Sequence, residues 1–256
     1  MRETALRLLV AAARFARAEA ALVGALIIVS LGAWGFAGIA EELLEDESIA
    51  FDRFVLDALR TPGGDPSDPI GPHWLDIAMT DLTALGSIAV LLTVALVVSG
   101  FLLIQRRAIS VMFIVTALGG GMLASSLLKV LFGRERPPDE FRAVEVINAS
   151  FPSGHAMLSA VAYLTIGAMV ARSQPKRRLK VYVMSIAVLL TFVVGFSRIY
   201  LGVHWASDVV GGWCVGAAWA GACWVSAWAF ERFFGRAGVS RPQHMPPAPA
   251  GAAAGE

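Results

Sequence analysis

Apolar residues gather in six long runs along the chain, separated by shorter polar segments. Each run is long enough, or nearly so, to cross a hydrocarbon core about 30 Å thick. None alternates between apolar and polar positions over its length, which disfavours a transmembrane barrel. Because backbone groups in lipid must be hydrogen-bonded within their own segment, each run predicts a helix. The runs are Ala20–Ala40, Thr83–Ile104, Ala108–Phe132, Ala156–Ala171, Val181–Phe196 and Val209–Phe230.

The composition agrees with this pattern. Of the 256 residues, 57% are hydrophobic and 16% are charged, and the mean hydropathy is +0.66. Soluble domains are about 45–50% apolar and about 25% charged. A water-soluble globule of this length would not hide so much apolar surface, so we predict an all-α, polytopic membrane protein with a six-transmembrane-helix bundle. The net charge of +1 gives no global field for binding nucleic acid, and none is expected as a partner.

The runs place one membrane domain in residues 1–234, whereas residues 235–256 are rich in Pro, Ala and Gly and predict a disordered cytoplasmic tail. The first run has a possible cleavage site at Gly38-Ile39-Ala40. It is longer than the usual apolar stretch of about 7–15 residues in a signal peptide, which favours a retained helix. Cys214 and Cys223 lie on opposite sides of one predicted helix, so no disulfide scaffold is expected. No Cys/His cluster has the spacing of metal ligands.

Basic residues are divided unevenly between the two sides of the predicted bundle. Fourteen Lys and Arg fall in the N-terminal segment, the loops after the second and fourth runs, and the tail, against seven on the other side. By the positive-inside rule both termini are cytoplasmic, in what we expect to be a bacterial inner membrane. The first outer loop, Glu41–Leu82, fits this orientation because it holds eleven acidic residues and two Arg.

Two segments of that outer loop have distinct patterns. Ser48–Arg60 places Phe51, Val55 and Leu59 at helical spacing among charged residues. We read a short amphipathic helix at the outer interface, with a mobile acidic loop as the alternative. Thr61–Pro72, with four prolines and three glycines, predicts irregular structure.

Polar residues, which are costly near a membrane, gather in three clusters at the outer ends of the last four runs. In the first, Lys129 and Arg136 are nearly two helical turns apart and could share a helix face, with Arg134 pointing elsewhere. Pro137 and Pro138 then end the helix. Taken alone, this pattern also fits a snorkelling lysine beside an ordinary basic loop.

The second cluster, Pro152-Ser153-Gly154-His155, opens the fourth run. Pro and Gly permit a close approach of the backbone to a ligand, and Ser153 is a favourable N-cap. The N–H groups at a helix N-terminus attract anions. His155 beside such a site could donate a proton to a leaving group. A capped helix start with an interfacial histidine is the alternative.

The third cluster runs from Ser197 to Asp208. His204 and Asp208 are four residues apart and face the same way if the last helix begins near Val203. A carboxylate on one imidazole nitrogen fixes the tautomer and leaves the lone pair of the other nitrogen free to attack. The guanidinium of Arg198 suits phosphate oxygens. A solvated His–Asp pair is the alternative.

Together the clusters point to one kind of chemistry. They put two of the four histidines and four of the seven outer basic residues on one face of the membrane. Cations that hold a multiply charged anion, one histidine that attacks and one that protonates suffice for phosphoryl transfer through a phosphohistidine, with no metal or cofactor. No glycine-rich nucleotide loop is present in the sequence, so ATP is not implied.

At these positions the sequence resembles the type 2 phosphatidic acid phosphatase family. The family signature, K-x6-R-P, P-S-G-H and S-R-x5-H-x3-D, is matched in order and without substitution over residues 129–208. The resemblance implies that His204 is the nucleophile, that Asp208 orients it, and that His155 acts first as acid and then as base. Arg134 lies outside the signature and is not assigned to the site. The resemblance also implies that the phosphoryl oxygens are bound by Lys129, Arg136, Ser153, Gly154 and Arg198.

The family also includes soluble vanadate-dependent haloperoxidases, but six membrane runs argue against that activity. The resemblance instead implies an integral membrane lipid phosphatase that hydrolyses phosphate monoesters or diphosphates. Its active site would be extracytoplasmic and its lipid phosphate substrate would come from the outer leaflet. Candidate substrates are undecaprenyl diphosphate, phosphatidylglycerophosphate, phosphatidic acid and diacylglycerol diphosphate, and family analogy with the outward-facing site favours the first.

Two other functions stay open at this point. A phosphotransferase on the same scaffold would pass the phosphate to an acceptor other than water. An anion transporter predicts charges near the midplane and broken or repeated helices, whereas the charges here lie at the ends of the runs. The oligomeric state is not defined by the sequence.

Overall fold

The computed structural model of the protein describes residues 2–45, 49–142 and 148–233. Within these ranges the chain forms eight α-helices, one 3-10 turn and no β-strand, so the all-α prediction is confirmed. The predicted tail, residues 235–256, lies outside the described residues. The helices are α1 (Arg2–Leu44), α2 (Ile49–Ala58), α3 (His73–Ala84), α4 (Ile88–Ile104), α5 (Ala108–Phe132), η1 (Asp139–Phe141), α6 (Gly154–Ser173), α7 (Arg177–Tyr200) and α8 (Ala206–Phe233).

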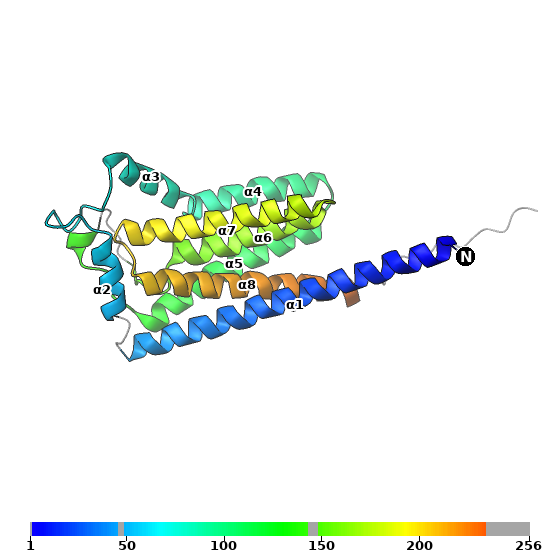
Figure 1. The fold of residues 1–256 in the computed structure, drawn as a ribbon, viewed down its shortest axis with the longest axis horizontal. Helices are drawn as coiled ribbons and strands as arrows, with labels where there is room; N and C mark the ends of the chain where they lie inside the picture. The colour runs from blue at the N-terminus through cyan, green and yellow to red at the C-terminus, as the bar shows by residue number, and fades with distance from the viewer. Residues whose placement is uncertain (1, 46–48, 143–147, 234–256) are drawn as a thin grey trace, which may run out of the picture.

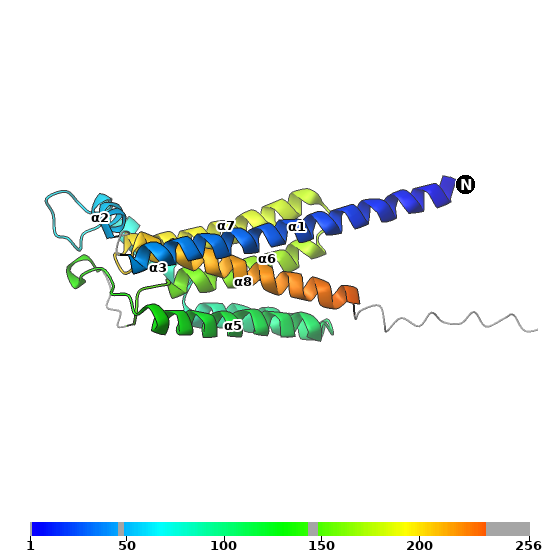
Figure 2. The ribbon, with the colours of Figure 1, turned by 90° about the horizontal axis from the view of Figure 1, so that it is seen from below.

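The long helices lie side by side in one elongated bundle (Figure 1). α6 packs against α5, α7 and α8, and α8 also packs against α1. In the turned view, α5 lies on the face opposite α1 and α7 (Figure 2). α2, α3 and the loops beside them gather at one end of the bundle, far from the N-terminus. This end carries the residues of the three sequence clusters.

Five helices are long and apolar enough to cross a membrane, namely α5, α6, α7, α8 and the part of α1 over Ala20–Leu44. The predicted run Thr83–Ile104 is not one helix. α3 ends at Ala84, α4 begins at Ile88, and the two helices are bent by 51°. The membrane character is confirmed, and the predicted count of six spans holds only if this bent pair is one span.

The break between α3 and α4 has a local cause. The hydroxyl of Ser87 accepts a hydrogen bond from the backbone N–H of Val90 at 3.3 Å and so caps α4. At Gly86, a Cβ would lie 2.3 Å from Cγ1 of Val194 and 3.3 Å from Cδ2 of His155. Because glycine has no side chain, the backbone at Gly86 can approach Val194 and His155 closely. The break therefore lies directly against α7 and the start of α6.

Small residues also bring the central helices together. At Gly212 and Gly216 of α8, a Cβ would lie 2.8 and 2.6 Å from the carbonyl oxygens of Ser153 and Met157. Close approach at small residues is typical of helix packing in membranes. The outward faces instead carry large exposed apolar side chains, among them Val130, which is 85% exposed. Such faces suit contact with lipid.

The predicted amphipathic helix within Ser48–Arg60 is confirmed as α2, and Thr61–Pro72 is irregular as predicted. Of its predicted apolar positions, Val55 and Leu59 pack against a core cluster, whereas Phe51 is 60% exposed. The carboxylate of Asp52, on the predicted charged face, is buried. A charged residue of the amphipathic pattern therefore points into the protein.

Candidate active site

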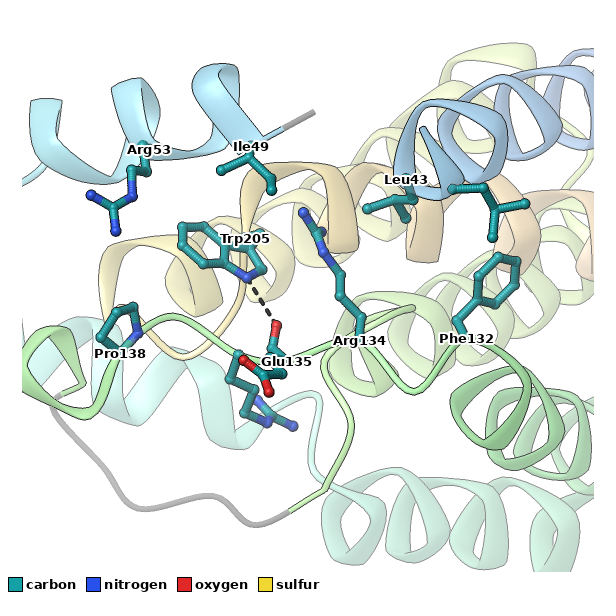
Figure 3. Close-up of a pocket in the computed structure, with 10 residues that line it drawn as sticks. Leu43, Ile49, Arg53, Phe132, Arg134, Glu135, Pro138 and Trp205 are labelled. Atoms are coloured by element: carbon teal, nitrogen blue, oxygen red, sulfur yellow. Dashed lines mark hydrogen bonds between the residues drawn. The ribbon is translucent and has the colours of Figure 1, made fainter. Parts of the chain in front are cut away.

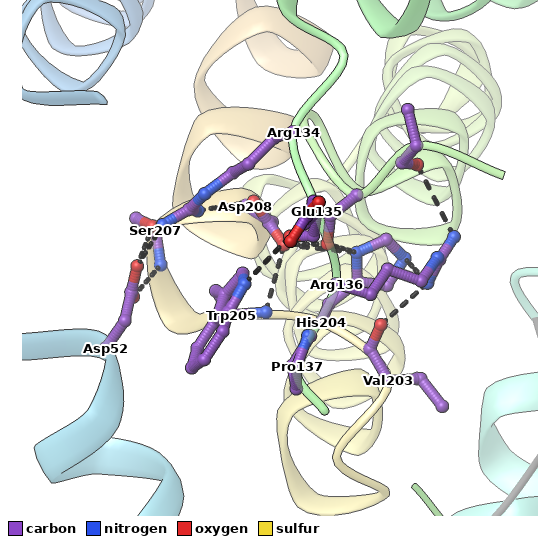
Figure 4. A network of polar contacts seen from close by, with 12 residues as sticks. Asp52, Arg134, Glu135, Arg136, Pro137, Val203, His204, Trp205, Ser207 and Asp208 are labelled. Carbon is purple, nitrogen blue, oxygen red and sulfur yellow. Dashed lines mark hydrogen bonds and ion pairs between the residues drawn. The ribbon is translucent and has the colours of Figure 1, made fainter. Parts of the chain in front are cut away.

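The clusters meet where several helix ends come together. These are the C-terminal ends of α5 and α7 and the first turns of α6 and α8, with α2 lying beside the start of α8 (Figures 1 and 4). Helix ends carry backbone N–H and C=O groups without intrahelical partners. Residues 133–142, residues 148–153 and the connection of residues 201–205 supply the remaining polar groups.

The end of α5 differs from the predicted one. The helix stops at Phe132 and does not continue to Pro137, because Gly133 adopts a left-handed conformation with φ of 56°. Lys129 and Arg136 therefore do not share a helix face. They approach one another because the chain turns after Gly133.

His204 lies in the connection before α8, since that helix begins at Ala206 and not near Val203. The predicted pair nevertheless forms, with Nδ1 of His204 3.3 Å from Oδ2 of Asp208. Nη1 of Arg136 lies 3.1 Å from Nε2 of His204. Because a guanidinium can only donate, Nε2 is the acceptor, and the imidazole proton resides on Nδ1, facing Asp208. This tautomer leaves the lone pair on Nε2.

The protonation of His204 follows from its surroundings. Burial lowers the pKa of His204, and this effect outweighs the Asp208 carboxylate, which raises it; Arg136 and Arg198 lower the pKa further. Only 2% of the residue is exposed. The imidazole is therefore neutral near pH 7, as a nucleophile requires.

Asp208 is completely buried and is held from several sides (Figure 4). Its Oδ2 accepts hydrogen bonds from the backbone N–H of Trp205 at 2.9 Å and from the hydroxyl of Ser150. Its Oδ1 accepts one from Nη1 of Arg134 at 2.6 Å. The Ser150 hydroxyl also lies 3.2 Å from Nδ1 of His204. These contacts fix the carboxylate and, through it, the imidazole ring.

A cavity of about 380 Å³ lies beside the imidazole. Ser153 and Asp208 are buried and are not part of its lining. The apolar part of the wall comes from α4, α5 and α6, including Leu92, Met122 and Leu158. Most of the predicted site residues are thus brought to one cavity. Those that line it are Lys129, Arg136, Gly154, His155, Arg198 and His204.

Besides the two histidines, the ionisable side chains that line the cavity are Lys129, Arg136 and Arg198, which are all cations. Lys129 and Arg136 donate to main-chain carbonyls of the loop before α6, and Arg198 donates to Oγ1 of Thr83 at 3.2 Å. Among the described residues none of the three pairs with a carboxylate, so their charge is available to an anion. Within the residues that the structure describes, no group of three or more His, Cys, Asp or Glu side chains is placed to hold a metal ion.

Two buried polar atoms beside this site have no hydrogen-bond partner among the residues that the structure describes, Nε of Arg198 and Oγ of Ser153. Ser153 occupies the N-cap position of α6 as predicted, but its side chain makes no capping bond. Buried donors are normally paired. Together with the N-terminus of α6, these two groups suit the oxygens of a bound anion.

Part of the polar network is not predicted by the sequence. Arg134 lies outside the family signature and was not assigned to the site, but it donates to both Asp208 and Asp52, each at 2.6 Å. Asp52 also accepts from the backbone N–H of Ser207 at 2.9 Å and from its hydroxyl at 2.5 Å. Ser150 lies just before the second motif and has no place in it. No sequence pattern points to Asp52, because its partner Arg134 is 82 residues away in the sequence.

A second hollow, of about 480 Å³, shares Arg136 with the cavity beside His204. Ile49 and Arg53 of α2 lie along it, and the indole N–H of Trp205 donates to the carbonyl of Glu135 at 3.0 Å (Figure 3). The short segment that carries the signature arginine therefore borders two cavities.

Comparisons with known proteins agree with this geometry. The family model described as the PAP2 superfamily matches residues 110–232, which include the whole signature. Phosphatidylglycerophosphatase B of Bacillus subtilis (strain 168) is 34% identical over 146 residues, or 56% of this chain and 70% of that protein. Undecaprenyl-diphosphatase of Sulfolobus acidocaldarius is 32% identical over 68 residues, or 27% of this chain and 29% of that protein.

Solved structures give the same result. The transmembrane PAP2-type phosphatidylglycerolphosphate phosphatase from Bacillus subtilis has a TM-score of 0.70 and 26% identity, covering 79% of this chain and 98% of that one. Aquifex aeolicus LpxE, with a TM-score of 0.50 and 24% identity, covers 71% of this chain and 94% of that one and supports the fold alone. The predictions of the family and of an enzyme of the lipid phosphatase type are confirmed. The chain belongs to the PAP2 superfamily.

Proposed function

We propose that the protein hydrolyses the terminal phosphate of a membrane lipid, a monoester or a diphosphate, through a phosphohistidine on His204. The observation that carries the proposal is the unprotonated Nε2 of His204, which lies 3.1 Å from Nη1 of Arg136 beside a cation-lined cavity. In the first step this lone pair forms a bond to phosphorus while the bond from phosphorus to the lipid oxygen breaks. Lys129, Arg136 and Arg198 bind the other phosphoryl oxygens and stabilise the charge of the transition state.

The second histidine handles the proton. His155 gives its proton to the departing lipid oxygen and then removes one from a water molecule. The water oxygen attacks phosphorus, the bond to Nε2 breaks, and inorganic phosphate leaves. Gly154 and Ser153 at the start of α6 bind phosphoryl oxygens in both steps. The scheme uses no metal ion, since three fixed cations neutralise the phosphoryl group.

The substrate class is supported by the position of the cavity. Its apolar wall includes Ile88 and Leu92 of α4, which are 54% and 48% exposed on the side of the bundle that suits lipid. A lipid in the outer leaflet could keep its chains beside this wall while its phosphate enters the cavity. The names of the relatives support phosphatidylglycerophosphate and undecaprenyl diphosphate as the first substrates to test.

The experiment is phosphate release from a panel of lipids by purified protein in detergent with excess EDTA. The panel holds phosphatidylglycerophosphate, undecaprenyl diphosphate and phosphatidic acid. We expect release by the wild type, and loss of about 1,000-fold or more in His204→Ala because the nucleophile is gone. His73→Ala is the matched control, since its side chain is 88% exposed on α3, and its rate should equal that of the wild type.

Other results would count against the proposal. Equal release by wild type and His204→Ala would exclude His204 as the nucleophile. Activity that EDTA abolishes and a divalent ion restores would contradict the metal-free scheme. Consumption of the donor lipid that begins only when an acceptor lipid is added, with the phosphate found on that acceptor and not in solution, would identify a phosphotransferase.

A further inference from the structure

A buried carboxylate on α2 is connected to the catalytic pair by short contacts (Figure 4). Oδ2 of Asp52 lies 2.6 Å from Nη2 of Arg134, and Nη1 of the same guanidinium lies 2.6 Å from Oδ1 of Asp208. Asp208 in turn faces Nδ1 of His204. We propose that Asp52 is a positioning residue for the nucleophile, acting through Arg134 and Asp208. The inference rests on the proposed function of His204.

Arg134 is well suited to transmit this effect. A planar guanidinium has its donors in a fixed fork, so holding one nitrogen orients the other. Asp52 holds one nitrogen of Arg134 and Asp208 the other, and both carboxylates are buried. If Asp52 loses its charge, Arg134 is less firmly held, and the carboxylate of Asp208 gains freedom to turn away from His204.

Asp52 also holds the first turn of α8, the helix that carries Asp208. Its Oδ1 accepts the backbone N–H of Ser207 at 2.9 Å, and its Oδ2 accepts the Ser207 hydroxyl. An anion at this position satisfies an unpaired N–H and is favoured by the helix dipole. Asp52 therefore fixes Asp208 by two routes, one through a side chain and one through the backbone.

The environment of Asp52 differs from that of the rest of α2. The neighbouring Phe51 and Phe54 are 60% and 70% exposed, whereas Asp52 is 1% exposed. Asp57, on the same helix, is exposed. α2 thus contributes one deeply inserted charge to the site, and its other fully buried side chain, Leu56, is apolar. The phosphate-binding cations do not contact Asp52, so its loss should affect turnover and not substrate binding.

The test measures kcat and KM for lipid phosphate hydrolysis by the full-length protein. We expect Asp52→Asn to lower kcat by about 10- to 100-fold, the size of the loss when a hydrogen-bonded partner that orients a metal-binding histidine is removed. KM should stay within about twofold. Asp57→Asn, the same change at an exposed position of α2, should leave both parameters unchanged. The melting temperature of each variant is measured in parallel.

A double mutant separates positioning from general damage. If Asp52 acts through Arg134, then Asp52→Asn should lower kcat by a smaller factor in an Arg134→Gln background than in the wild type, and the loss that remains measures the route through Ser207. Equal losses in both backgrounds, or a rise in KM with kcat unchanged, would overturn the inference. So would wild-type kcat in Asp52→Asn.

A second variant covers the case in which Asp52→Asn does not fold. Arg134→Lys keeps the charge but cannot hold two carboxylates in a fixed fork, so kcat should again fall while KM is kept. Wild-type kcat in Arg134→Lys would overturn the inference. The proposed function is tested separately, by phosphate release from lipid by the wild type and the loss of that release in His204→Ala.

Discussion

The proton on Nδ1 of His204 decides whether the imidazole can attack. Asp208 keeps it there, and an amide at position 208 could equally well accept or donate, which would stabilise the wrong tautomer. We therefore expect Asp208→Asn to lower kcat by about 100-fold or more, with KM nearly unchanged. Steady-state kinetics on a variant with a cooperative melting transition checks this. Near-wild-type turnover would mean that the pair has been assigned wrongly.

The burial of His204 also has a consequence for stability. Its pKa is below the ordinary value of 6.5, so as the pH falls below about 6.5 the unfolded chain takes up a proton that the folded chain does not. The folded state is thereby destabilised by up to about 1.4 kcal/mol per pH unit until the folded pKa is reached. The contribution is present in full above pH 6.5 and is lost on acidification.

We expect the melting temperature of the wild type to fall further between pH 7.5 and pH 5 than that of His204→Gln, because glutamine has no imidazole to titrate. Differential scanning fluorimetry in detergent measures both variants at each pH. Parallel loss in the two proteins would show that the imidazole is already accessible to protons in the folded state.

Single residues were predictable where the motif is local. His204 and Asp208 lie four residues apart, so their pairing followed from helical spacing even though α8 begins later than expected. Arg134 and Asp52 are joined by tertiary structure alone, and no periodic pattern connects a loop arginine to a helix 82 residues earlier. Their roles follow only from the three-dimensional structure.

At the scale of elements, the break between α3 and α4 shapes the cavity wall. A methyl group at Gly86 would meet Cγ1 of Val194 at 2.3 Å and the His155 ring at 3.3 Å. Gly86→Ala should therefore cost about 1–3 kcal/mol of folding free energy and also lower kcat, because either α7 or His155 must move. Unfolding in denaturant and the rate of phosphate release measure the two effects.

The control for this change is Gly100→Ala on α4, where nothing lies within 4 Å of the added methyl group. Alanine favours a helix over glycine by about 1 kcal/mol, so this variant should be no less stable than the wild type and equally active. If Gly86→Ala behaved in the same way as Gly100→Ala, the close packing at the break would be irrelevant to the site.

Element types were easier to predict than element ends. The long apolar runs correctly predicted helices. α5, however, ends at Phe132 and not at Pro137, because the left-handed conformation of Gly133 stops the helix by itself. The run Thr83–Ile104 showed no interruption in hydropathy, although Gly86 and Ser87 break it. Helix ends depend on such single residues, whereas helix existence depends on the average of many.

At the scale of the whole molecule, the distribution of charge predicts the orientation in the membrane. The site end carries the acidic segment between α1 and α4, and the opposite end carries the basic loop between α6 and α7. We expect an impermeant maleimide to label Asp68→Cys in intact cells, and Lys176→Cys only after lysis, in a background lacking Cys214 and Cys223. Labelling of Lys176→Cys alone in intact cells would reverse the proposed topology.

The general architecture could be predicted because lipid imposes helices on every spanning segment. The way α6 and α8 pack in the middle could not, since it depends on close contacts at residues such as Gly212 and Gly216, whose significance is invisible without a partner helix. The three motifs come together only because these central helices and α5 and α7 end at the same level.

The most direct test of the proposed mechanism is to trap the phosphoenzyme. Wild-type protein is mixed with lipid substrate labelled in its terminal phosphate, quenched within one turnover, and digested for mass spectrometry. We predict label on the peptide that contains His204, stable in alkali and labile in acid as expected for a phosphorus–nitrogen bond, and none in His204→Ala. Rapid turnover by the wild type with no label on His204, or with label on another residue, would exclude His204 as the nucleophile.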